Sequence, residues 1–218
     1  MTAALRRSVV GLVVVLGAAA PALAQTYTFE RAIRAGAGAR LDVSTHRGTI
    51  AVIGGDDDEI VVSGKVTARS GLNMPINRAQ LAADAAGHPP IRQLGATVEL
   101  RPPSDPLVDR AVTIDYVVRV PPATVVVAVS DSGTVTVTSV AAAVSVRTQS
   151  GDIDVTLPSS APVTLDATTG SGSIDVDRSL VEGAVDKGHV HGTIRGGGAL
   201  WQLTTRSGAI RVKQAARG

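Results

Sequence analysis

The stretch Val146-Arg-Thr-Gln-Ser-Gly-Asp-Ile-Asp-Val155 decides the fold, because four other stretches of the chain repeat its pattern. Every copy has a glycine near its centre, Ile or Val two residues after that glycine, and Val four residues after it. Side chains alternate between the two sides of a β-strand, so these aliphatic positions lie on one buried face. The other copies are residues 43–52, 129–137, 167–176 and 203–212, and the five central glycines are Gly48, Gly133, Gly151, Gly172 and Gly208.

The spacing of the copies indicates a stack of short coils. With a degenerate sixth copy, His189-Val-His-Gly-Thr-Ile194, the glycines from Gly133 onward are 18, 21, 20 and 16 residues apart. These lengths match one coil of two or three short strands and are short for a βαβ unit, which takes about 30 residues. We therefore predict an all-β fold, a parallel β-helix or solenoid in which Ile153, Ile174 and Ile210 lie over one another.

Two further features of the repeat support short, tightly turning coils. Glycine adopts positive φ without steric cost, which suits a sharp turn between two strands. Three residues before each glycine comes a hydroxyl side chain, which suits an inward or corner position where neighbouring coils satisfy each other's polar atoms. These hydroxyl residues are Thr45, Ser130, Thr148, Thr169 and Thr205.

The region between Gly48 and Gly133 is too long for one coil. Residues 60–68, 96–100 and 111–120 are rich in Val, Ile and Thr and are expected to be longer strands. We predict that they form an N-terminal antiparallel β cap over the open core, together with a short helix within residues 75–87. The expected organisation is 25–122 for the first coil and the inserted sheet, 123–213 for the solenoid repeats, and 214–218 for a tail.

The N-terminus predicts export. Arg6 and Arg7 precede an apolar run over residues 9–20, and Ala22 and Ala24 fit cleavage before Gln25. We expect residues 1–24 to be a removed signal peptide, with no stable membrane anchor left after cleavage. The chain has no Cys, which excludes disulfides, thiolate metal sites and a lipid-modified cysteine.

The charge balance argues against a nucleic-acid partner. Removal of residues 1–24 lowers Lys+Arg from 21 to 19, against 19 Asp+Glu, so the mature chain is formally neutral. A nucleic-acid binder needs a basic stripe that replaces the counterions of phosphates. Aromatic content is 2%, so the chain is suited to a narrow core of short β-branched side chains.

The serial Ser-Gly-x-Ile-x-Val units, residues 148–155 above all, resemble those of the bacterial putative-adhesin family of exported repeat proteins. The runs over residues 48–62 and 115–121 share in this resemblance, which covers nearly all of residues 38–213. The resemblance implies a β-solenoid fold and a domain of unknown function. The family name implies adhesion at the cell surface, and no functional residues carry over from it.

One row of outward-facing residues is a candidate site. Three residues after the glycines, the row is expected to place Asp175 against Arg195 as an exposed charge pair. The alternative is a polysaccharide-lyase-like groove in which Asp152, Asp154 and Asp175 hold Ca²⁺ and Arg195 acts as base. The members of the row are Thr136, Asp154, Asp175, Arg195 and Arg211.

The remaining candidates have structural interpretations. The acidic run over residues 56–59 suits a solvated hairpin turn. His189 and His191 share one side of a strand, but without an evident third ligand we assign no zinc site. Trp201, beside two leucines, is expected to plug the end of the core. Ser171 lacks the Gly-x-Ser-x-Gly setting of a hydrolase nucleophile.

The sequence therefore predicts a non-catalytic, exported, adhesin-like envelope protein with no cofactor and no metal. It presents a β-solenoid surface to a protein or polymer partner, in the periplasm or at the cell surface. Two alternatives stay open, a Ca²⁺-dependent polysaccharide lyase or hydrolase on a β-helix and a periplasmic envelope-stress scaffold or sensor module.

Overall fold

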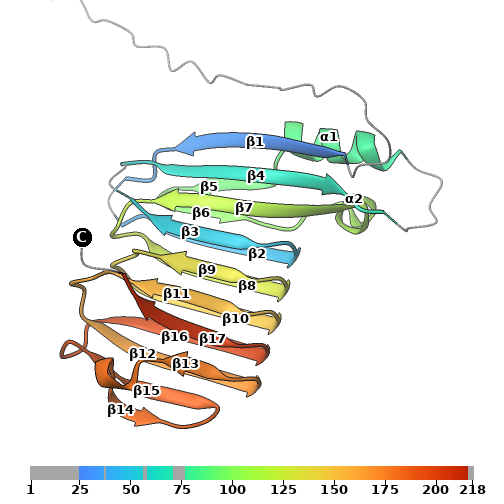
Figure 1. Cartoon of the computed structure of the whole chain (residues 1–218). Coiled ribbons are helices and arrows are strands. Elements are labelled where there is room, and N and C mark those ends of the chain that lie inside the picture. The colour runs from blue at the N-terminus through green and yellow to red at the C-terminus, as the bar shows by residue number, and fades with distance from the viewer. Residues whose placement is uncertain (1–24, 37, 56–57, 71–76, 216–218) are drawn as a thin grey trace, which may run out of the picture.

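The computed structural model describes residues 25–36, 38–55, 58–70 and 77–215. The predicted signal peptide, residues 1–24, lies outside this part of the chain. Two large sheets face each other, an eight-stranded sheet A and a nine-stranded sheet B (Figure 1). The predicted all-β, solenoid-like fold is confirmed, although each sheet mixes parallel and antiparallel pairs.

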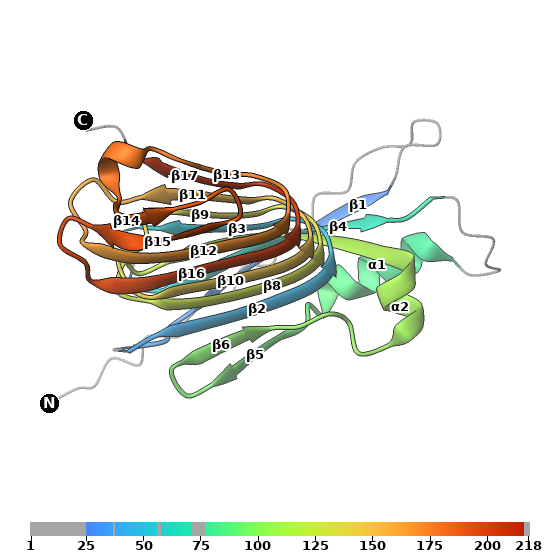
Figure 2. The same ribbon diagram turned by 90° about the horizontal axis from the view of Figure 1, so that it is seen from below.

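The glycine-centred repeats form five coils of two strands each. In every coil a strand of sheet B leads through the glycine turn into a strand of sheet A, and Figure 2 shows the coils lying over one another. The coils are β2 (Arg40–Arg47) with β3 (Ile50–Gly54), β8 (Val125–Ser132) with β9 (Val135–Thr138), β10 (Val144–Ser150) with β11 (Ile153–Leu157), β12 (Val163–Ser171) with β13 (Ile174–Val176), and β16 (Ala199–Ser207) with β17 (Ile210–Gln214).

The coils do not stack in chain order. The fifth coil, β16–β17, lies between the third, β10–β11, and the fourth, β12–β13. In sheet A, Ile210 pairs with Ile153 on one side and with Ile174 on the other. The predicted stacking of these three residues is confirmed, with the last of them in the middle.

The core is a set of aliphatic rows between the two sheets. The Ile and Val residues two positions after the glycines are fully buried in four coils, and only Ile174 is half-buried. This exception follows from position, because β13 is the last strand of sheet A. Trp201 is also fully buried, and its indole N–H donates to the Ala142 carbonyl (3.1 Å). Its predicted core role is confirmed, but it lies inside the stack and not at the end.

The turn glycines form a column in which each approaches the next coil's backbone. A Cβ on Gly151 would lie 2.1 Å from the Gly133 carbonyl oxygen, and one on Gly208 would lie 2.2 Å from that of Gly151. Gly208 has φ 153°, whereas Gly151 is not among the positive-φ residues. Close approach is therefore the requirement shared by the column, and positive φ adds to it at most of its members.

The predicted hydroxyl ladder lies beside this column and is buried. Thr148 Oγ1 is 2.8 Å from Thr205 Oγ1, and both lie within 3.1 Å of the Gly151 carbonyl oxygen. Thr169 donates to the carbonyl of Gly208 (3.0 Å), which belongs to the neighbouring coil. Neighbouring coils thus satisfy one another's polar atoms at Thr148, Thr169 and Thr205, as predicted. Thr45 instead donates to the Arg47 carbonyl of its own coil (2.6 Å), and the buried Ser130 Oγ has no partner among the described residues.

The N-terminal strands extend the two sheets. The antiparallel strands β1 (Thr26–Ile33), β4 (Ile60–Ala68) and β7 (Val112–Val120) continue sheet A, and the hairpin of β5 (Ile91–Leu94) and β6 (Thr97–Leu100) continues sheet B. Three of these strands match the predicted segments. The prediction of one antiparallel sheet is wrong, because these strands are divided between the two sheets and β6 and β7 pair parallel with the strands of the first coil.

Helices and a crossover complete this end. The predicted helix is confirmed as α1 (Arg78–Gly87), which packs against β4 and β1, and α2 (Pro106–Ala111) precedes β7. The acidic run was predicted to be a hairpin turn between strands that pair. This is wrong, because β7 lies between β3 and β4 in sheet A. Residues 56 and 57 of that run lie outside the described part of the chain.

The supposed sixth repeat is not a coil. β14 (Glu182–Val185) and β15 (His189–Ile194) form a hairpin that pairs antiparallel with β12 at the other end of sheet B. A short 3₁₀ turn, η1 (Arg178–Leu180), leads into it. Gly192 lies inside β15 because Glu182 and Val181 leave no room for a Cβ, and not because the chain turns there. The resemblance to the repeat was therefore local.

Candidate functional site on the outer face of sheet A

Two rows of side chains cross the outer face of sheet A. We call them the sheet A rows. They follow from the parallel register, which places equivalent residues of neighbouring coils side by side, about 4.8 Å apart. The first row is Ala51, Thr136, Asp154, Arg211 and Asp175, and the second is Ile53, Thr138, Thr156 and Lys213.

Arg211 is the electrostatic centre of the first row. Its Nη1 lies 3.0 Å from Asp152 Oδ2 and 3.0 Å from Asp154 Oδ1, and in the register it is opposite Asp175. The Arg211 guanidinium donates hydrogen bonds to Asp154 and Asp152, and these bonds raise the pKa of Arg211. The backbone N–H of Ala209, followed by Arg211, holds the pKa of Asp152 below its ordinary value. One cation of the fifth coil therefore binds two carboxylates of the third coil.

The residue set of the lyase hypothesis does not assemble. Arg195 lies in the turn after β15, where it donates to the carbonyls of Pro158 (3.2 Å) and Ala161 (2.8 Å). The predicted Asp175–Arg195 pair is wrong, because the inserted coil supplies Arg211 in its place. No group of three acidic or histidine side chains within the described ranges is arranged to hold a metal ion. The guanidinium of Arg211 takes the position that the hypothesis gave to Ca²⁺.

The two histidines share the outer face of sheet B, as the alternation of β15 predicts. His189 Nε2 lies 3.4 Å from Asp166 Oδ1, and His191 Nδ1 lies 4.0 Å from Asp166 Oδ2. The ring centroids are 6.3 Å apart, and all three side chains are exposed by at least a third. This cluster ties the terminal hairpin to β12 at the surface.

A second ionic cluster at the N-terminal end was not predicted. Arg101 Nη1 lies 2.7 Å from Asp42 Oδ1, and its Nη2 lies 3.2 Å from Glu99 Oε1. The hydrogen bond with Asp42 is the main cause that raises the pKa of Arg101. Arg101 and Asp42 are 59 residues apart, so no local pattern in the sequence links them.

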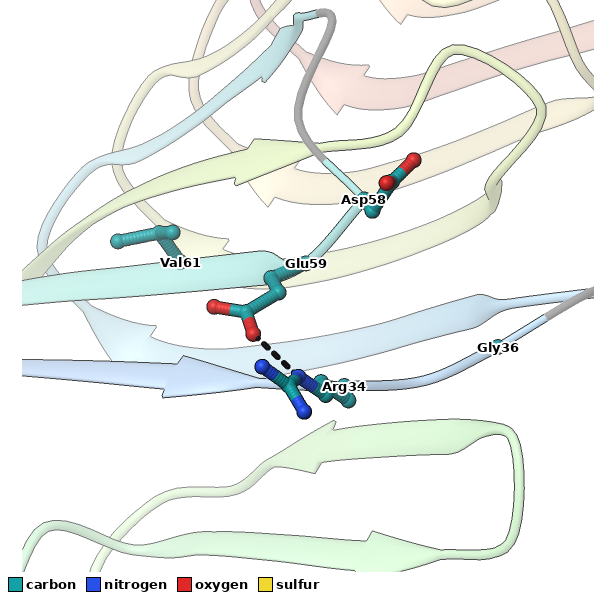
Figure 3. A pocket seen from close by; sticks show the side chains of 5 residues that line it. All are labelled: Arg34, Gly36, Asp58, Glu59 and Val61. Carbon is teal, nitrogen blue, oxygen red and sulfur yellow. Dashed lines mark hydrogen bonds and ion pairs between the residues drawn. The ribbon is translucent and has the colours of Figure 1, made fainter. Parts of the chain in front are cut away.

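A surface depression of about 610 Å³ lies beside β1 and β4 (Figure 3). Arg34, Gly36, Asp58, Glu59 and Val61 line it. Arg34 Nε and Glu59 Oε1 face each other at 2.7 Å, with the Arg34 side chain 84% exposed. An ion pair this exposed contributes about 0–1 kcal/mol. The depression is thus an open, solvated feature.

The helices in the described ranges are too short and too polar to span a bilayer. Between β3 and β11 the sheet A rows consist mainly of short side chains, three Thr residues with Ala51, Ile53 and Asp154.

Comparison with known proteins places this architecture. Nothing among curated proteins matches the chain. A crystal structure of a putative cell adhesion protein from Clostridium sporogenes is similar in fold, with a TM-score of 0.50 and 14% sequence identity. The similarity covers 86% of this chain and 100% of that chain. Residues 120–213, which hold four of the five coils, match the family described as Toastrack DUF4097, a domain of unknown function. The resemblance inferred from the repeats is thereby confirmed, because the matching residues 120–213 contain four of the repeats on which it rests.

Proposed function

We propose that the chain is a non-catalytic, exported envelope protein that binds a protein or polymer partner through the outer face of sheet A. In this proposal the coils form a short parallel β-helix whose ends are closed by antiparallel strands. Export is supported by the signal-like N-terminus, and adhesion by the fold shared with the clostridial protein.

The observation that carries the proposal is the regularity of the sheet A rows. Thr138 and Thr156 present hydroxyl groups on neighbouring strands, and Thr136 presents one two residues before Thr138 on β9. Beside them, Ile53 and Val117 are apolar residues with 38% and 44% exposure. Across β3 and β9 the rows thus consist of hydroxyl and apolar groups, whereas Asp154, Arg211, Asp175 and Lys213 carry charge at their other end. This arrangement suits an extended partner that contacts several coils at once and has an uncharged segment over β3 and β9.

The binding face is tested by pull-down from an envelope extract with matched variants. Thr138→Arg places a long charged side chain on the rows, and Thr204→Arg makes the same change on the outer face of sheet B. Both threonines are half-buried strand residues that point away from the core. We expect Thr138→Arg to lose the partner captured by the wild type and Thr204→Arg to keep it.

Two outcomes contradict the proposal. Equal capture by both variants would remove sheet A as the binding face. A purified protein that captures nothing but turns over an oligosaccharide would replace binding with catalysis.

A further inference from the structure

The strand β1 forms one end of sheet A and differs from the other exposed edges. It pairs with β4 over eight consecutive residues without a bulge, and no described strand pairs with its other side. The remaining end strands β5, β13 and β14 have four, three and four residues. Natural sheets usually shorten their edges or block them with Pro, Lys or bulges. β1 has no Pro, Lys or bulge, and its charged residues are Glu30 and Arg31.

The register shows which backbone groups β1 offers at its open side. The Ala68 N–H donates to the Gln25 carbonyl (3.0 Å), so these opposite residues form a hydrogen-bonded pair. Such pairs alternate along an antiparallel ladder. Phe29 and Arg31 therefore use their backbone groups toward β4, and Thr28, Glu30 and Ala32 direct theirs away from it. The latter three are also exposed.

We propose that β1 pairs antiparallel with β1 of a second copy of this chain, about a two-fold axis at Phe29. In this register, Thr28 of one copy lies opposite Glu30 of the second copy and forms the hydrogen-bonded pair. Tyr27 of one copy lies opposite Arg31 of the second copy, where a guanidinium on an aromatic face is favourable. The two sheets A become one continuous sheet. This inference does not depend on the proposed binding face.

Charge disfavours the registers in which the axis lies nearer the C-terminus of β1. Every second residue of β1, Thr28, Glu30 and Ala32, directs its backbone groups to the open side. The register between the two copies can therefore change only by steps of two residues. A shift that centres the axis on Glu30 places two glutamates directly opposite each other, and one that centres it on Arg31 opposes two arginines. Like charges directly opposite destabilise a strand pair. With the axis at Phe29, both charged residues face uncharged partners that accept them.

Arg31 protects this edge in the single molecule. Its Nη1 donates to the Glu30 carbonyl (2.9 Å), which is one of the acceptors on the open side. On pairing, the Thr28 N–H of the second copy takes over this acceptor, and the guanidinium becomes free to cover Tyr27 of the second copy. The exchange keeps the carbonyl satisfied in both states, so we expect a reversible, concentration-dependent dimer.

The test changes the charge at residue 28. Sedimentation of the protein over a range of concentrations at low salt measures the dimer dissociation constant. Thr28→Lys places a cation opposite Glu30 of the second copy, and Thr28→Glu places an anion there, twice in each dimer. A cross-strand charge pair contributes about 0.2–1 kcal/mol, so two of them change the dimer dissociation constant by about 2- to 30-fold. We expect Thr28→Lys to lower that constant and Thr28→Glu to raise it.

The controls are Gln202→Lys and Gln202→Glu, which make the same charges at an exposed position of sheet B. They are expected to leave the dimer constant unchanged. A wild type that stays monomeric at all concentrations would overturn the proposal, as would equal effects of Lys and Glu at residue 28. Thr28→Pro removes the edge N–H without touching the ladder to β4, and a variant that still folds and dimerises would also overturn it. Partner capture in the pull-down is read separately, so neither failure is mistaken for the other.

Discussion

Single residues at the turns of the coils determine whether the stack closes. The glycine column brings backbone atoms of neighbouring coils into contact, and a hydrogen atom is the largest group that fits between them. The hydroxyl ladder next to it adds side-chain hydrogen bonds to the backbone bonds that join the turns of neighbouring coils. The glycine and the hydroxyl residue recur in every coil, but the hydroxyl groups differ in their partners.

Gly151→Ala is expected to destabilise the protein by about 3 kcal/mol or more, because the new Cβ must displace the Gly133 backbone. Gly87→Ala is the control, since a Cβ there meets no atom within 4 Å. At the end of α1 the replacement is expected to be neutral or stabilising by up to about 1 kcal/mol. Urea unfolding followed by circular dichroism measures both. Equal midpoints for the two variants would contradict the close-approach account.

Ser130 and Thr205 occupy equivalent places in the ladder but differ in their partners. Ser130→Ala removes a buried hydroxyl that has no partner among the described residues, so the free energy of unfolding should stay the same or rise by about 1 kcal/mol. Thr205→Val removes bonds to Thr148 and to the Gly151 carbonyl and should cost about 1 kcal/mol. A loss of stability in Ser130→Ala equal to that in Thr205→Val would show that Ser130 has a bonding partner.

At the scale of elements, ionic contacts hold the fifth coil against the third. Asp152 accepts the Ala209 N–H at 2.8 Å and contacts Arg211, both of which belong to the inserted coil. The sheet A rows carry the adjoining Asp154 bond. Burial of the aliphatic rows stabilises the packing between coils. The polar contacts of Asp152 and Asp154 determine which coil lies next to which.

Stability should depend on pH through Asp152. Its pKa in the folded protein is held below that of the unfolded chain, which is about 4. The folded state therefore gains stability from the carboxylate above about pH 4 and loses it as the pH falls through the folded pKa. Asp152→Asn should be less stable than wild type at pH 7 by about 1 kcal/mol or less, since the group is 36% exposed.

The difference between wild type and Asp152→Asn should shrink toward pH 2, as measured by urea unfolding at each pH. Asp175→Asn is the control, because Asp175 forms no ion pair with Arg211 in the described structure. Its difference from wild type should stay smaller at pH 7. A difference for Asp152→Asn that grows on acidification would contradict the assigned hydrogen bonds.

How far the sequence predicts these elements depends on whether the signal is local. The turn, the buried positions and the hydroxyl ladder lie within ten residues of each glycine, and the prediction for them is confirmed. The order of the coils is not local. Ile153, Ile174 and Ile210 present the same side chain to any neighbour, so the pattern allows several orders of nearly equal packing. The error at Asp175 and Arg195 follows directly from this degeneracy.

Long-range contacts explain the other omissions. Arg101 meets Asp42 across 59 residues, and α2 and β5 are short elements whose place depends on packing against distant strands. The degenerate repeat at residues 189–194 has the glycine and the isoleucine of the repeat pattern. It is nevertheless the second strand of a hairpin, so it runs antiparallel to its neighbours. Local composition does not record that direction.

At the scale of the whole molecule, the last coil of the described chain lies inside the stack, between the third and the fourth coil. β16 lies between β10 and β12, and β17 lies between β11 and β13. Coils that are consecutive in the chain therefore cannot complete the core by adding one to the next. The third and fourth coils become neighbours of a common partner only when residues 199–214 have joined them.

A chain that ends at Gly198 should fail to unfold cooperatively, because its third and fourth coils lose the strands between them. We expect flattened urea transitions and binding of a hydrophobic dye, measured by circular dichroism and fluorescence. As a control, replacement of residues 183–192 by a short flexible linker removes edge strands and keeps the fifth coil. This variant should unfold cooperatively at lower urea. Cooperative unfolding of the truncated chain would contradict the central role of the fifth coil.

The position of the fifth coil also has a consequence for the degradation of incomplete copies of this protein. Synthesis delivers a chain from its N-terminus, so the fifth coil is made after the two coils between which it lies. A copy that lacks this coil has no strands between its third and fourth coils, and the change is therefore inside the stack and not only at one tip. Proteases that cleave open structure can thus distinguish finished from unfinished molecules without recognising either terminus.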